Sequence, residues 1–212
     1  MINWITDSIG RWTTPDPEEE LMMVGHVLKE EDRLTLVHPP VLPGLPDVLA
    51  SLGSVRAIIL TTHDHTRGSR YLSDLFACPI YAPVQADRSR LDAGRVQRPE
   101  WYEESTPLPG GLVARRTIVT MSDGRPYMDE MSLQRSDVLF IGDLLTGNLD
   151  GTLAVCPEQF PGVSDVEQKT AKVARALLGS IGSAPRLVLA GHGWPFSGDW
   201  QAALTKRVGE AP

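Results

Sequence analysis

The sequence predicts an α/β or α+β protein, because apolar runs of strand length alternate with segments of helical spacing in both halves of the chain. In the first half, a strand, a helix and a second strand follow one another within residues 34–60. In the second half, a helix at 166–181 is followed directly by a strand at 187–190. Three apolar runs between the halves are typical of neighbouring strands. We therefore expect sheets that are covered by helices on their outer faces.

In the first half, the predicted elements are bounded by residues that end helices or strands. The strand at 34–37 stops before Pro39, and the helix at 46–52 stops at Gly53. The next strand is aliphatic and β-branched and is interrupted only by Arg56. In chain order, the predicted elements are a strand at 34–37, a helix at 46–52, a strand at 55–60, a helix at 69–76 and a strand at 79–82.

In the second half, the most regular pattern is the helix, in which Val166, Val173 and Leu177 recur at helical spacing. The three preceding runs are short and apolar, and we expect them to form antiparallel neighbours. In chain order, the predicted elements are strands at 112–119, 131–133 and 138–141, a helix at 166–181, a strand at 187–190 and a helix at 197–208.

Length and charge limit the classes of protein. With 212 residues and no linker-like tract, we expect one domain over 1–212. A net charge of -7 argues against a nucleic-acid partner. No apolar run approaches the roughly 18 residues that span a bilayer, and no leader pattern begins the chain, so we expect a cytoplasmic protein without membrane partners. Cys78 and Cys156 match no metal or redox spacing and are expected to be buried thiols, although a disulfide stays open.

Ligand-type side chains follow three of the predicted strands. His63, Asp64 and His65 come after the strand at 55–60, Asp143 follows 138–141, and His192 follows 187–190. The chain has only five histidines, so this concentration at strand ends is informative. Imidazole and carboxylate groups held by strand ends can surround a metal ion. The pattern therefore predicts one shared metal site.

In this order, these strand ends resemble the metallo-β-lactamase superfamily, and the similarity extends from the strand before Pro39 to Trp194. The resemblance implies a four-layered αββα sandwich. It also implies a signature of His-x-His-x-Asp-His, then a lone His, a bridging Asp and a final His, which together hold two metals.

This sequence keeps only part of that signature. Residues 64–68 look like the family's Asp-His-x-Gly-Gly, with residues 60–62 in place of His-x-His. An alternative alignment, which places His63 and His65 on the signature's His-x-His, would make these two histidines ligands of the first metal. No histidine lies between His65 and His192, and the stretch 119–124 offers only hydroxyl, thioether and carboxylate groups. The first metal site is therefore expected to be lost.

The resemblance then implies one divalent ion, Zn²⁺ first and Mn²⁺ or Fe²⁺ as alternatives, since no thiolate selects a softer metal. The predicted ligands are Asp64, His65, Asp143 and His192, with His63 as a further candidate, and the predicted catalytic residues are Asp64 and Asp143. This set predicts a metal-dependent hydrolase acting on a small-molecule substrate. The alternative is an inactive metallo-β-lactamase-like binding protein that has lost one or both metals.

Simpler roles are open for each residue. Asp64 could cap the helix that begins near Ser69, Asp143 could be a turn residue, and His192 could be a core histidine between glycines. His38 stands where relatives often carry an Asp that orders the metal loop, but it also fits a solvated strand end. Arg67 could reach a bound anion or form a surface ion pair.

Overall fold

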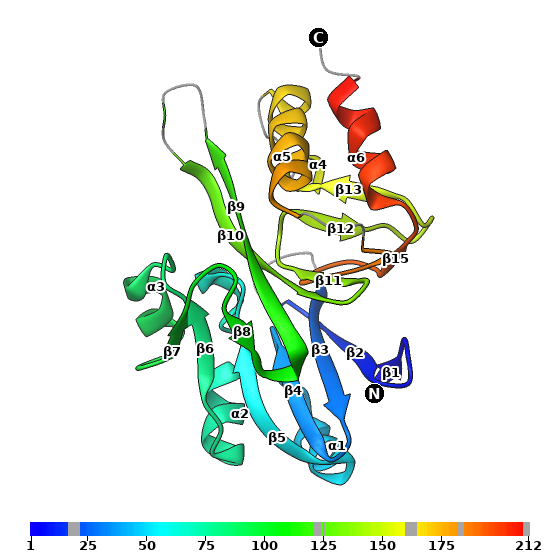
Figure 1. Cartoon of the computed structure of the whole chain (residues 1–212). Helices are drawn as coiled ribbons and strands as arrows, with labels where there is room; N and C mark the ends of the chain where they lie inside the picture. The colour runs from blue at the N-terminus through cyan, green and yellow to red at the C-terminus, as the bar shows by residue number, and fades with distance from the viewer. Residues whose placement is uncertain (17–21, 121–123, 125, 160–164, 182–184, 210–212) are drawn as a thin grey trace. The chain divides into compact units, whose positions relative to one another are not determined.

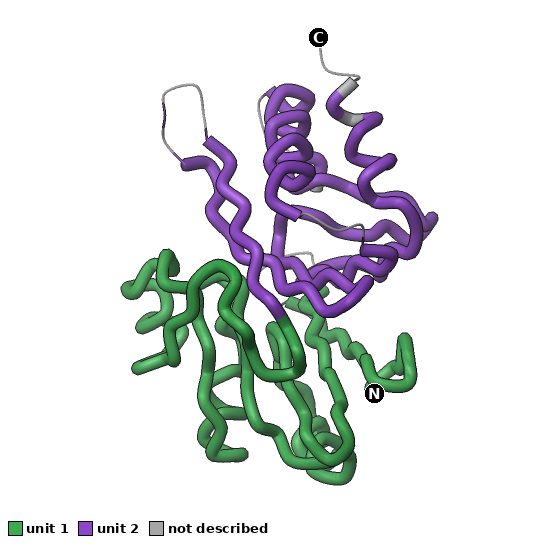
Figure 2. Tube along the Cα trace, viewed as in Figure 1, with its two compact units in different colours: residues 1–112 green, residues 113–212 purple. Residues whose placement is uncertain are grey.

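The computed structural model describes residues 1–16, 22–120, 124, 126–159, 165–181 and 185–209. It contains two compact units, residues 1–112 (unit 1) and 113–212 (unit 2), which Figure 2 colours separately. The single domain over 1–212 stays a prediction.

Unit 1 is built on a seven-stranded sheet in the order β1-β2-β3-β4-β5-β6-β7 (Figure 1). The strands from β1 to β4 pair antiparallel, and those from β4 to β7 pair parallel. The strands are β1 Asn3–Trp4, β2 Ile9–Pro15, β3 Met22–Glu30, β4 Arg33–Val37, β5 Ser54–Ile59, β6 Ile80–Pro83 and β7 Glu100–Tyr102, with β8 Pro107–Leu108 after them. The helices are α1 Leu45–Leu52, α2 Ser69–Phe76 and α3 Arg88–Ala93, with short 3-10 turns η1 His63–His65 and η2 Pro109–Gly111.

The core of unit 1 joins one face of this sheet to its helices. Leu34 and Leu36 alternate on β4 and belong to the same buried cluster as Leu49 of α1 and Leu72 of α2. Because β4, β5 and β6 run parallel, their carboxyl ends meet at one edge of the sheet. The loops that follow these strands therefore gather there, and they carry His38, His63 and His65.

Unit 2 contains a sheet whose strands lie in the order β15-β14-β11-β10-β9. β11 and β14 are parallel, and the other neighbouring pairs are antiparallel. The strands are β9 Leu112–Thr120, β10 Pro126–Arg135, β11 Val138–Ile141, β14 Leu187–Ala190 and β15 Phe196–Ser197, with a separate pair β12 Leu145–Gly147 and β13 Leu153–Val155. The helices are α4 Cys156–Gln159, α5 Val166–Ser180 and α6 Trp200–Gly209.

The core of unit 2 lies between this sheet and two helices that Figure 1 shows side by side, α5 and α6. Ile141 of β11 and Ala190 of β14 share a buried cluster with Leu177 of α5 and Trp200 of α6. The β11–β14 pair is thus covered by apolar side chains on one face, and its parallel direction brings the residues after Ile141 and after Ala190 to the same edge.

Most predicted elements are confirmed. The helix at 69–76 and the strands at 138–141 and 187–190 have the bounds that were expected, and the antiparallel neighbours of the second half are β9, β10 and β11. Both cysteines are buried free thiols, so the disulfide is not present. Of the stretch 119–124, residues 121–123 lie outside the described residues.

The sequence did not predict β2, β3 or α3. Both strands carry polar residues in buried positions, Arg11 at 7% exposure and His26 at 1%. Burial, then the charges of Arg11 and Arg67, lowers the pKa of His26 to about 3, so this imidazole is neutral. A buried neutral histidine packs like an apolar side chain, which a hydropathy pattern does not reveal.

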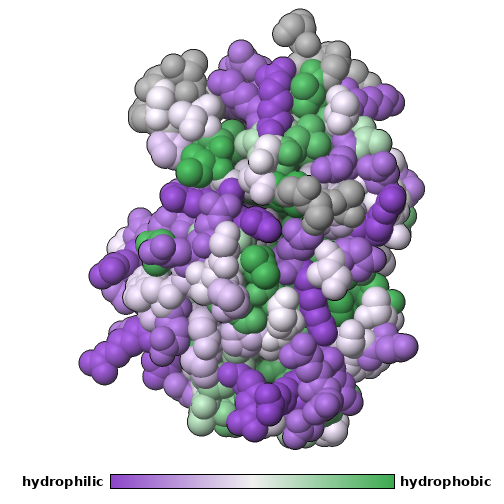
Figure 3. Space-filling view, in the orientation of Figure 1, coloured by the Kyte–Doolittle hydropathy of each residue, from purple (hydrophilic) through white to green (hydrophobic). Residues whose placement is uncertain are grey.

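Most of the large apolar side chains are in these two cores. On the face drawn in Figure 3, hydrophilic residues form most of the described surface, and hydrophobic ones gather in separate small patches. Among the described residues, no helix has the length and apolar character that crossing a membrane would require.

Alanine substitutions at two glycines are expected to change the free energy of unfolding in opposite directions. An added Cβ at Gly25 would lie 2.5 Å from the Trp12 indole, whose Nε1 donates to the Pro40 carbonyl, so Gly25→Ala is expected to cost about 1–3 kcal/mol. Gly179 is exposed within α5 with nothing near its Cβ position, so Gly179→Ala is expected to add about 0.5–1 kcal/mol. Urea unfolding of both variants measures the two changes, and a stable Gly25→Ala protein would contradict the packing described for Trp12.

Candidate metal centre

In unit 1, the turn after β5 is held by His38. Its Nε2 accepts a hydrogen bond from the Thr61 backbone N–H at 3.1 Å and lies 2.8 Å from Thr61 Oγ1. His38 is fully buried, so the solvated strand end is wrong and the ordering role is the one that fits. The next residue, Thr62, caps the η1 turn by accepting from the Asp64 N–H. These hydrogen bonds fix the backbone at the start of the turn that carries residues 63–65.

His65 is the buried member of the turn, at 3% exposure. Its ring packs edge-on against that of His38, with ring centres 4.6 Å apart. Arg67, just beyond, donates from Nη1 to the Val24 and His38 carbonyls, which ties the same loop to β3. These contacts engage Nη1 of Arg67, and the anion contact and the surface ion pair considered for this residue stay predictions.

His63 and Asp64 are engaged by α3. The Asp64 carboxylate forms an ion pair with Arg90, with Oδ1 2.5 Å from Nη2, and its Oδ2 lies 3.5 Å from His63 Nε2. The other ring nitrogen of His63 accepts the N–H of Asp87 at 3.2 Å. The structure therefore places these two predicted ligands in one polar network with Arg90. Their roles as ligands stay predictions.

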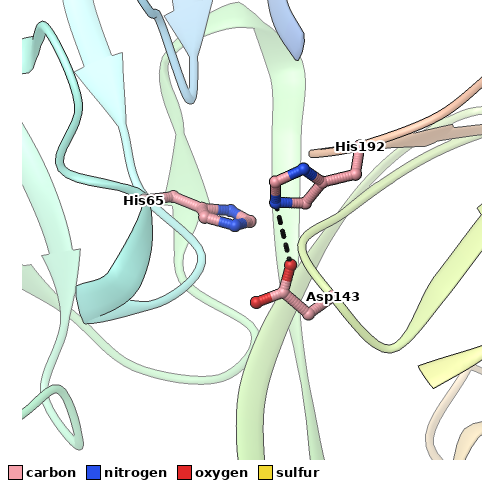
Figure 4. Close-up of side chains that lie close together, drawn as sticks. All are labelled: His65, Asp143 and His192. Carbon is pink, nitrogen blue, oxygen red and sulfur yellow. Dashed lines mark ion pairs between the residues drawn. The ribbon is translucent and has the colours of Figure 1, made fainter. Parts of the chain in front are cut away.

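In unit 2, Asp143 and His192 come together as the parallel strands predict. Asp143 follows β11, His192 follows β14, and His192 Nε2 lies 3.4 Å from Asp143 Oδ1, the contact dashed in Figure 4. The His192 carbonyl accepts from Thr146 Oγ1, and Gly193 has a φ of +70° where a side chain would meet Thr146. This packing against β12 fixes the histidine loop.

Glu130 lies beside the candidate site, and the sequence did not predict it. It lies on β10 at 3% exposure, and its two carboxylate oxygens accept hydrogen bonds from the backbone N–H groups of Gly142 and Asp143. Burial, followed by the charge of Asp143, raises the pKa of Glu130 to about 8, although the backbone donors oppose that shift. Burial and the same two carboxyl groups raise the pKa of the nearby Cys156 thiol to about 12, which keeps it a neutral thiol.

The Asp143–His192 pair fits a metal ion. Two ligand atoms that each lie about 2.1 Å from one tetrahedral Zn²⁺ are about 3.4 Å apart. A direct charge-assisted hydrogen bond is shorter, at about 2.7–2.9 Å. The observed 3.4 Å between Nε2 and Oδ1 matches the first arrangement. One carboxylate and one imidazole also suit Zn²⁺, Mn²⁺ and Fe²⁺ alike.

Solved structures share the fold of this chain, whereas no family model and no curated protein matches it. The DIM-1 metallo-β-lactamase exposed to ceftazidime is 16% identical, with a TM-score of 0.69 over 100% of this chain and 95% of that chain. The metallo-β-lactamase from Hirschia baltica is 13% identical, with a TM-score of 0.62 over 98% and 95%. The enzyme from Pontibacter korlensis is 11% identical, with a TM-score of 0.61 over 99% and 97%.

These likenesses cover nearly the full length of every chain compared, which neither unit alone could give. They agree with the order of the strand ends that carry His65, Asp143 and His192. The predicted α/β (α+β) class is confirmed, and the chain has the metallo-β-lactamase fold.

Proposed function

We propose that the protein is a metal-dependent hydrolase with one divalent ion, held by His65, Asp143 and His192, the residues labelled in Figure 4. The observation that carries the proposal is the Nε2–Oδ1 separation of 3.4 Å between His192 and Asp143 at the shared end of β11 and β14. His65 is the third member because its ring is buried at the corresponding end of β5 and is ordered by His38. Each of the three residues offers one ligand atom.

The chemistry of hydrolysis needs an activated water and a polarised substrate. A bound Zn²⁺ supplies both, since it lowers the pKa of a coordinated water to about 7 and acts as a Lewis acid. Three protein ligands leave coordination positions open for water and substrate. The chain's own contribution is to hold the ligands still: Glu130 fixes the backbone of Asp143, and Thr146 fixes that of His192.

In this proposal, the Asp143 carboxylate also orients the attacking water. The carboxylate lies beside His192, where it would be close to a water held by such an ion. A carboxylate in that place orients the water toward a small-molecule substrate that carries an ester, lactone, thioester or phosphodiester bond. Asp64 remains the other predicted catalytic residue.

The second candidate function is a metal-binding or metal-free protein that does not turn over a substrate. It is favoured by the Arg90–Asp64 ion pair, because that pair engages the carboxylate that the resemblance assigns to the metal. The two candidates make different predictions for the same assay.

The test is a hydrolysis screen with protein stripped by chelator and reloaded with Zn²⁺, Mn²⁺ or Fe²⁺. The panel contains esters, lactones, thioesters and phosphodiesters. We expect metal-dependent turnover of at least one class, lost in Asp143→Asn and His192→Gln but kept in Asp150→Asn, which removes the same charge from an exposed turn of unit 2. A metal-loaded protein that turns over none of these classes would favour the binding protein instead.

A further inference from the structure

We propose that a groove in unit 1 binds a small organic cation with an apolar body, such as a substituted alkylammonium ion. The groove has a volume of about 500 Å³ and lies between α2 and the segment that leads into α1. Small-molecule sites commonly have volumes of about 300–1,000 Å³. None of the described residues that line the groove is a candidate metal ligand, so the inference is independent of the proposed function.

One wall of the groove is the outer face of α2. Tyr71 and Leu75 are one helical turn apart and line the groove at 53% and 50% exposure, whereas Leu72 of the same helix is buried in the core of unit 1. The charged residues beside them form an ion pair with each other, with Arg70 Nε 2.6 Å from Asp74 Oδ2. The outer face of α2 therefore presents an aromatic ring and an aliphatic side chain as neighbours.

The opposite wall is the proline-rich segment that joins β4 to α1. Gly68, just before α2, donates its N–H to the Pro39 carbonyl, and a Cβ at Gly68 would clash with Val41. The Leu45 N–H donates to the Leu42 carbonyl, and Leu45 itself is fully buried. The apolar residues that line the groove from this side are Val41, Leu42, Pro43 and Pro46. Both walls are thus held by the protein's own contacts, which lowers the entropy cost of binding.

Asp47 sets the charge of the groove. It lies in the first turn of α1 and is the one described residue of the lining whose side chain is ionised near neutral pH. Within the described ranges, no Lys or Arg forms an ion pair with this carboxylate. A carboxylate and the face of an aromatic ring such as Tyr71 both attract a cation, and apolar walls accept a hydrocarbon body. The groove therefore favours a positively charged head group over a neutral or negative one.

The experiment is an NMR titration of the ¹⁵N-labelled full-length chain with three probes that share one body, phenylbutylammonium, phenylbutanol and phenylbutanoate. We expect the ammonium ion to shift the backbone signals of the two walls and to bind about 3- to 5-fold more tightly than the alcohol, with the carboxylate weakest. Asp47→Asn should remove the preference for the ammonium ion and leave the affinity for the alcohol unchanged. Tyr71→Ala should weaken both probes by about 3- to 10-fold.

Two substitutions outside the groove are matched controls. Asp92→Asn removes the same charge from an exposed position on α3, and Val84→Ala shortens an apolar side chain that is 45% exposed. Both variants should bind the probes within about 2-fold of wild type.

Several results would overturn the inference: no shifts in the two walls, equal affinity for the three probes, a preference for the ammonium ion that survives Asp47→Asn, or an equal loss of that preference in Asp92→Asn. Wall signals that move with protein concentration alone would also overturn it, because a second copy of the chain would then be the occupant of the groove.

Discussion

Replacement of His192 by alanine is expected to lower Zn²⁺ affinity by more than about 100-fold, since loss of an outer-shell partner already costs about 10- to 100-fold. The imidazole Nε2 is one of the two candidate ligand atoms that are 3.4 Å apart in unit 2, and the flanking glycines offer no replacement donor. Asp143 would remain as the only ligand at that edge of the β11–β14 pair. A lone carboxylate binds a divalent ion weakly.

Chelator competition measures this loss, and far-UV circular dichroism shows that the variant is folded. His65→Ala should lose affinity to a similar extent. His63→Ala is the informative comparison, because His63 Nδ1 accepts the Asp87 N–H and its contacts run to α3. We expect His63→Ala to change affinity by less than about 3-fold. A large loss in His63→Ala together with a small loss in His192→Ala would contradict the proposed ligand set.

Replacement of Glu130 by alanine is expected to destabilise the protein by about 2–4 kcal/mol. Its carboxyl group accepts from the N–H groups of Gly142, where the hydrogen bond is buried, and of Asp143, where it is partly buried. Removal of the side chain leaves one buried and one partly buried donor without an acceptor and leaves a cavity on β10. Glu130→Gln keeps the size and one carbonyl acceptor, so it should cost about half as much.

Urea unfolding of the metal-free protein measures both changes. Glu158→Ala is the control, because Glu158 accepts the Val155 N–H from an exposed position and should cost less than about 1 kcal/mol. If Glu130→Ala is no more costly than Glu158→Ala, the two backbone hydrogen bonds do not hold the Asp143 loop.

The contribution of Glu130 to folding stability should also depend on pH. The pKa of Glu130 is raised to about 8 in the folded protein, above its ordinary value of 4.5. The stabilisation from the protonated carboxyl is therefore fully present below pH 4.5 and is lost as the pH rises through about 8. Glu130→Gln, which cannot ionise, should flatten that part of the stability profile of the metal-free protein.

The sequence was sufficient for the parts of the site that follow from strand direction. An apolar run followed by Gly142-Asp143, and another followed by Gly191-His192, predict two strand ends, and the parallel pairing of β11 with β14 brings those ends together. His65 could be predicted in the same way from the end of β5. Prediction of these residues required only local sequence patterns and the rule that parallel strands bring their carboxyl ends to one edge.

The residues that were not predicted depend on contacts between elements that are distant in sequence. A charged residue within a strand, such as Glu130, is ordinarily read as solvent-facing, and only the folded loop at Gly142 supplies its hydrogen bonds. Arg90 sits in a short, highly charged segment whose helix is stabilised by its cap and by packing against Thr66. The strands β2 and β3 were missed because Gly25 makes room for Trp12, a complementarity that no periodic pattern contains.

The most direct test of the central claim is X-ray absorption of the protein loaded with one equivalent of Zn²⁺. Ligation by His65, Asp143 and His192 predicts the scattering of two imidazole rings in the wild type and of one ring in either His65→Ala or His192→Ala, with oxygen donors in all three. Two rings that persist in both variants, or a shell of oxygen donors alone in the wild type, would contradict a shared metal centre.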